Sequence, residues 1–130
     1  MGSLTQTNNT IVWTSGNPSE SNAVEVINSI NYNISYLNGV KYYVPDDNNI
    51  HNLVTYFCSI NPIGEKCQYI CTSRVIDMNN LFHGQYEFNT DIGNWDTSKV
   101  EDMSQMFLHA RVFNQDIGNW ITSKVENMTL

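Results

Sequence analysis

A stretch of thirteen residues occurs twice in this chain, 25 positions apart, and it restricts the folds that the chain can adopt. The copies lie at 88–100 and 113–125 and share the pattern F-N-x-D-I-G-N-W-x-T-S-K-V. The period extends backwards, because residues 72–75 match residues 97–100. A fixed period of this length is typical of a solenoid, in which each repeat buries its apolar side against its neighbours.

Each repeat is predicted to hold a short strand, a turn and a short helix. Its bulky positions, at Ile92, Trp95, Thr97 and Val100, have the spacing of a leucine-rich repeat. We expect a strand at 95–98 and a helix that starts at an N-cap (Asp77, Asp102 or Asn127). The apolar side of the helix would carry Met103, Met106, Phe107 and Ala110.

Alternation along the predicted strands divides their side chains between core and surface. Trp95 and Trp120 are expected in the core, although an exposed indole could instead bind a sugar. The outward positions form a candidate ligand-binding surface, named here the repeat face, because solenoids bind through such extended surfaces. It consists of Ser73, Asn94, Asp96, Ser98, Asn119, Ile121 and Ser123, with Cys71 beside Ser73.

The chain is predicted to be an α/β (α+β) solenoid with an N-terminal α+β cap. Residues 72–130 would form the repeats (72–96, 97–121 and a partial 122–130), and residues 1–71 would cover the open end of their core. Within the cap we expect a strand at 11–13, helices at 18–30 and 49–58, and a hairpin at 34–44. The hairpin rests on Asn38-Gly39, a strong two-residue turn signal.

The repeat motif, continued as x-[DN]-M, resembles that of the BspA-like leucine-rich repeat surface proteins, the DUF285 repeat family. The resemblance covers about 72–130. It implies a secreted or cell-surface protein, adhesion or another binding role towards a protein or glycan, and no catalytic residues. The chain departs from the family in length, since it holds two complete repeats and a fragment where arrays are usually long.

Composition argues against nucleic acid and membranes as partners. The formal net charge is −7, from 6 basic and 13 acidic residues, which disfavours nucleic acid and anionic membranes. No apolar run reaches the ~18–20 residues of a membrane span, so membrane insertion is not predicted. Residues 1–4 do not resemble a signal peptide, so for a surface location we expect that a native signal has been removed and replaced at the start of this sequence. No enzyme motif, cofactor site or phosphate loop is apparent.

Two clusters have alternative interpretations. Cys58, Cys67 and Cys71 could include a disulfide, could form a zinc site with His51, or could remain free thiols; they lack the C-x₂-C spacing of a zinc site. We predict a Cys58–Cys67 disulfide and no metal. Asp91 and Asp116 could form a calcium ladder, or their carboxylates could bind turn backbone.

The C-terminal repeat stops at Leu130 without a polar capping segment. We expect Ile117, Trp120 and Val125 to need cover, from further repeats or from a neighbouring chain. Self-association through this end supports an alternative function: a structural subunit that assembles end to end in a surface layer, filament or virus particle.

Overall fold

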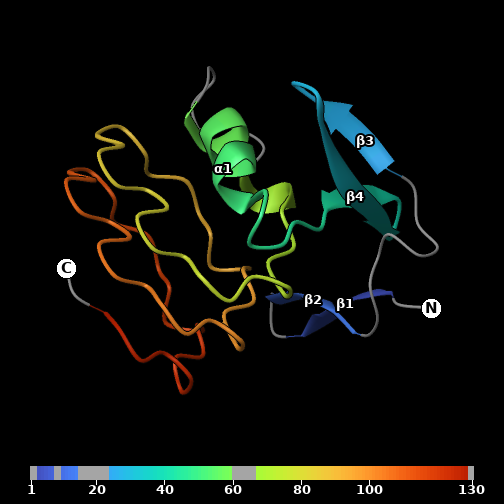
Figure 1. Ribbon diagram of the computed structural model, residues 1–130. Helices are drawn as coiled ribbons and strands as arrows, with labels where there is room; N and C mark the ends of the chain where they lie inside the picture. The colour runs from blue at the N-terminus through green and yellow to red at the C-terminus, as the bar shows by residue number, and fades with distance from the viewer. Residues whose placement is uncertain (1–2, 8–9, 15–23, 60–66, 129–130) are drawn as a thin grey trace.

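The computed structural model describes residues 3–7, 10–14, 24–59 and 67–128 (Figure 1). Two small antiparallel sheets precede the repeats. One pairs β1 (Leu4–Thr7) with β2 (Thr10–Trp13), and the other has the order β3 (Val24–Ile27), β4 (Ile30–Leu37), β5 (Val40–Tyr43). The helix α1 (Ile50–Ser59) and the 3₁₀ helix η2 (Cys67–Tyr69) follow. The strand expected at 11–13 is thus part of β2.

The hairpin predicted at 34–44 is confirmed, and the helix predicted at 18–30 is wrong where it can be compared. β4 and β5 pair from Ile34↔Tyr43 to Leu37↔Val40. Residues 24–27 form β3 and not a helix, while residues 18–23 lie outside the described part of the chain. Asn28 and Ser29 both have positive φ, 50° and 67°, which suits a two-residue hairpin turn and ends any helix.

The predicted second helix, at 49–58, corresponds to α1. Its apolar side chains (Ile50, Leu53, Val54 and Phe57) are all buried. Asn49 is its N-cap residue, because the Asn49 carbonyl accepts a hydrogen bond from the Leu53 N–H at 3.1 Å. In Figure 1, α1 lies between the β3–β4–β5 sheet and the repeats.

Successive repeats lie side by side on the other side of α1 (Figure 1). Backbone hydrogen bonds join positions 24 residues apart, among them Met78 N–H to the Asp102 carbonyl at 2.8 Å and Phe82 N–H to the Met106 carbonyl at 2.9 Å. Isolated parallel bridges connect Asp77 to Asp102 and Asp102 to Asn127. Neighbouring repeats are therefore held together by main-chain contacts as well as by side chains.

The strand and the helix predicted within each repeat are not present in residues 72–128; turns replace them. Two pairs of equivalent positions have positive φ: Asn80 with Gln105, and Gly84 with His109. A residue with positive φ cannot continue a right-handed helix. Alternate N–H groups that a helix would direct to its own preceding turn reach the next repeat instead, as that of Asn80 does, whereas the groups between them, such as that of Leu81, bond three residues back.

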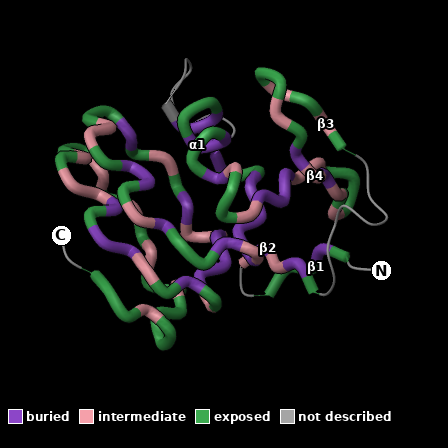
Figure 2. Tube along the Cα trace, in the orientation of Figure 1, coloured by how far each residue is buried: buried purple, intermediate pink, exposed green. Residues whose placement is uncertain are grey.

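Aromatic rings fill the interior of the repeats. Phe82 stacks on Phe88 with ring centroids 4.2 Å apart, and Phe107 stacks on Phe113 at 4.4 Å, 25 positions later. Trp95 lies against Phe82 and is 1% exposed, whereas its equivalent Trp120 lies against Phe107 and is half-buried. The predicted core position of Trp95 is confirmed. Figure 2 shows that burial decreases towards the last repeat.

Candidate binding face

The β1–β2 hairpin covers the first part of the repeat face. Trp13 N–H donates to the Ser73 hydroxyl at 2.8 Å, and Ile11 N–H donates to the Asn94 carbonyl at 2.9 Å. Alternation along β2 buries the side chains of Ile11 and Trp13, which form a small core with Leu4, Val44 and Cys71. The hairpin therefore uses both backbone and apolar side chains to bind this surface.

Burial of Ser73 and Asp96 is a correction to the prediction that both face solvent. They are 2% and 7% exposed. The Ser73 hydroxyl donates to Asp96 Oδ2 at 2.7 Å, and Ser98 N–H donates to Asp96 Oδ1 at 3.0 Å. Sequence alternation places these side chains on one side of the repeats, but it does not reveal that a distant hairpin covers them.

The far part of the repeat face remains open. Cys71, Asp96 and Ile121 are equivalent positions, and their exposed fractions are 0%, 7% and 55%. Asn119 and Ser123, on either side of Ile121, are also exposed, while Ser98 and Asn94 are half-buried. The Asn94 amide donates to the Gln68 carbonyl at 2.9 Å.

A groove of about 310 Å³ separates the hairpin from the last repeat. Its lining combines residues of the hairpin with the open part of the repeat face: Thr7, Thr10, Val12, Asp96, Ser98, Asn119 and Ile121. The hairpin residues are missing from the predicted site, since nothing in the sequence links residues 4–13 to the repeats. The only local signal is the strand-like run Thr10-Ile11-Val12-Trp13.

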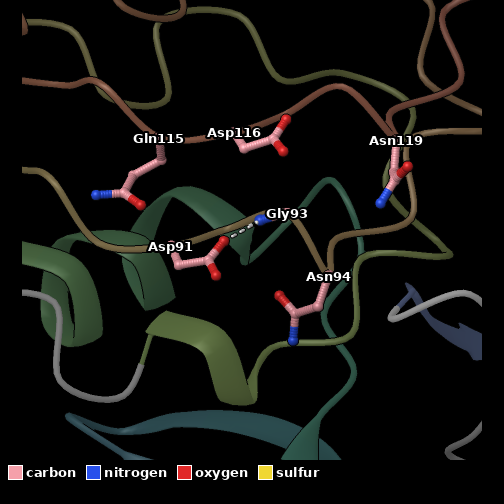
Figure 3. A pocket seen from close by; sticks show the side chains of 6 residues that line it. All are labelled: Asp91, Gly93, Asn94, Gln115, Asp116 and Asn119. Atoms are coloured by element: carbon pink, nitrogen blue, oxygen red, sulfur yellow. Dashed lines mark hydrogen bonds between the residues drawn. The ribbon is translucent and has the colours of Figure 1, made fainter.

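A second, smaller pocket of about 210 Å³ lies between equivalent turns of two repeats (Figure 3). Asp91 and Asp116 both line it, but each carboxylate Oδ1 accepts the backbone N–H two residues ahead, of Gly93 and Gly118, at 2.8 Å. These contacts correspond to the turn-stabilising alternative. Within the described ranges, no group of three or more His, Cys, Asp or Glu residues could hold a metal ion.

Glycine is required at the first of these turns by the close approach of the next repeat. A Cβ at Gly93 would lie 2.9 Å from the Asp116 carbonyl oxygen, a backbone atom, whereas a Cβ at Gly118 would meet only the Asp116 carboxylate, at 3.0 Å. The two equivalent glycines therefore differ in their tolerance of a side chain.

The cysteines divide as the sequence predicts. Cys58 and Cys67 form a disulfide with Cα atoms 5.0 Å apart, which connects α1 to η2. Cys71 is a free buried thiol, and burial raises its pKa. The pairing of Cys58 with Cys67 removes two ligands from the alternative zinc site. The sequence Asn61-Pro62-Ile63-Gly64 predicts a turn between these two cysteines, but it lies outside the described residues.

Comparison with known protein families gives a match over most of the chain. The family model described as "Mycoplasma protein of unknown function, DUF285" matches residues 25–130, which includes the β3–β4–β5 sheet, α1 and the repeats. Curated proteins and solved structures give no significant match. Among the helices of the described residues, none has both the length and the apolar character needed to cross a membrane.

Proposed function

The chain belongs to the DUF285 family, and we propose that it is a non-enzymatic binding module of a secreted or cell-surface protein. In this proposal the repeats are a BspA-like leucine-rich repeat solenoid. The module would act in adhesion or in recognition of a protein or glycan, without a cofactor or metal. Support for the location comes from the Cys58–Cys67 disulfide, because disulfides persist mainly in oxidising compartments.

The observation that carries the binding role is the exposed end of the repeat face beside the groove. Ile121 is 55% exposed and has exposed polar neighbours at Asn119 and Ser123. An exposed apolar centre with a polar rim resembles the composition of protein interfaces. The acidic net charge of −7 argues against nucleic acid as the ligand.

A test presents the immobilised protein to a glycan array and to a displayed library of random peptides. Ligands selected by the wild-type chain are then measured against Ile121→Lys, which places a charged side chain at the centre of the face. The matched control is Val112→Lys, because Val112 is 50% exposed and does not line the groove. We expect binding to fall at least about tenfold, or 1.4 kcal/mol, only in the first variant. The binding role is wrong if neither screen yields a ligand, or if both variants bind it equally.

End-to-end assembly in a surface layer, filament or virus particle is a second candidate, and a different observation favours it. Positions that are buried in one repeat are more exposed in the next: Phe88, Ile92 and Val100 are 0–1% exposed, but Phe113, Ile117 and Val125 are half-buried. Met103 is 4% exposed and its equivalent Met128 is 54% exposed. The repeat that follows covers the buried members of these pairs, which are Phe88, Ile92, Val100 and Met103.

Light scattering over a concentration series tests the assembly candidate. A mass that rises with concentration, and falls to that of the monomer in Met128→Lys, supports assembly through the last repeat. A monomer at every concentration excludes self-association of this chain and leaves the binding role unaffected.

A further inference from the structure

We infer that the groove beside the β1–β2 hairpin binds an extended, basic segment of a partner polypeptide. The inference rests on the proposed binding function and specifies its ligand. Two properties of the groove lead to it: a buried carboxylate that has no cationic partner, and a neighbouring surface that already holds an extended strand.

Asp96 is the only ionisable residue among the described residues that line the groove. Asp96 is only 7% exposed, and it forms no ion pair within the described part of the chain. Its two hydrogen bonds, from Ser73 and Ser98, fix the carboxylate and use only part of its capacity of about four acceptor sites. A lysine or arginine side chain in the groove would supply the missing charge, and such charge-assisted hydrogen bonds are strong.

The repeat face already binds extended backbone at its covered end. β2 lies there with Ile11 and Trp13 directed inward and with Thr10 and Val12 less buried, and the latter two form one wall of the groove. Ile121, on the opposite wall, is equivalent to Cys71, which β2 covers. A second extended segment can therefore place an apolar side chain against Ile121 and a basic one near Asp96, as alternate residues of a strand permit.

The lining favours a peptide over a glycan. No aromatic ring is among the described residues that line the groove, although a stacking platform for a sugar ring requires one. Trp95, which could have served, is 1% exposed, and the Trp120 indole N–H donates to the Ile92 carbonyl at 3.1 Å inside the repeats.

The test is an NMR titration of the full chain with three nine-residue peptides of alternating Thr and Val that carry Lys, Gln or Glu at the centre. We expect the Lys peptide to bind about tenfold more tightly than the Glu peptide and to shift the amide signals of Ser98, Asn119 and Ile121. Added salt should weaken this preference. Equal affinity for the three peptides, or shifts away from the groove, would overturn the inference.

Two variants and a control separate a specific pair from general attraction to an acidic protein. Asp96→Asn should remove the preference for Lys over Gln, whereas Asp91→Asn, which changes net charge equally but lies outside the groove, should preserve it within about twofold. Ile121→Lys alters an exposed residue and so should leave folding intact while it abolishes binding of the Lys peptide; this variant decides the matter if Asp96→Asn fails to fold. Equal effects of Asp91→Asn and Asp96→Asn would contradict the pairing.

A result that refutes the preference for basic segments can be distinguished from a result that refutes the proposed binding role. If a glycan or a non-basic peptide is selected in the earlier screens and its binding is lost in Ile121→Lys, the repeat face remains a binding surface and its preference for basic segments is refuted.

Discussion

Replacement of Trp95 by Ala tests whether the repeats depend on their aromatic interior. The side chain is 1% exposed, lies against Phe82 with ring centroids 5.6 Å apart, and donates its indole N–H to the Cys67 carbonyl at 3.3 Å. A buried aromatic side chain removes about 150–250 Å² from water, which corresponds to about 4–6 kcal/mol at about 25 cal/mol per Å². Since alanine retains a methyl group, we expect the free energy of unfolding to fall by about 3–5 kcal/mol.

Urea unfolding followed by far-UV circular dichroism measures this loss without relying on tryptophan fluorescence. The matched control is Trp120→Ala at the equivalent position, where the ring is half-buried and its N–H also reaches a carbonyl 28 residues earlier. Its loss should be smaller, about 1–3 kcal/mol. The reasoning is refuted if Trp95→Ala costs under about 1 kcal/mol, a value typical of surface substitutions, or if the two losses are equal.

Three further results are expected. Alkylation of denatured, non-reduced protein should label one cysteine, and Cys58→Ser should lower the free energy of unfolding by about 2–3 kcal/mol by opening the short Cys58–Cys67 loop; three labelled cysteines would rule the disulfide out. Gly93→Ala should lower the free energy of unfolding by about 1–3 kcal/mol, because the added Cβ would contact the Asp116 backbone carbonyl. Gly118→Ala should lower it less, because its Cβ would contact only the movable Asp116 carboxylate. A larger calorimetric loss in Gly118→Ala than in Gly93→Ala would contradict the observed stacking of repeats. The Ser104 hydroxyl and N–H lower the pKa of Asp102. The ionised Asp102 carboxylate therefore stabilises the fold fully above the ordinary carboxyl pKa, and this stabilisation disappears as pH falls through the lowered pKa. In unfolding curves at several pH values, Asp102→Asn should lose less stability on acidification than the wild-type chain.

The period of the sequence predicts which residues become neighbours, but it does not predict the local backbone. The core position of Trp95 follows from the period and from alternation, and the 24-residue hydrogen bonds agree with it. The helix expected after Asp102 does not form, because Gln105 and His109 have positive φ and their neighbours bond to other repeats. Propensity and apolar spacing are local signals, and main-chain bonds between repeats override them.

The same limit explains the helix wrongly predicted at 18–30. Val26, Ile27 and Ile30 have helical spacing, yet Val24 and Val26 alternate with half-buried neighbours in a strand. The Asn28-Ser29 turn is a weaker signal than Asn38-Gly39, although it adopts positive φ at both residues. At the candidate site, Ile121 and Asn119 could be predicted from the period, but the wall of the groove formed by Val12 depends on tertiary contact alone.

The position of the β1–β2 hairpin has a consequence for synthesis of the chain. Trp13 donates to Ser73, 60 residues later, so the hairpin leaves the ribosome before its docking surface exists. At about 5–20 residues per second, that interval is about 3–12 s, during which Ile11 and Trp13 have no core to enter. We therefore expect docking of the N-terminal hairpin to be a late step in folding, and Trp13 to be a site at which a chaperone can recognise the nascent chain.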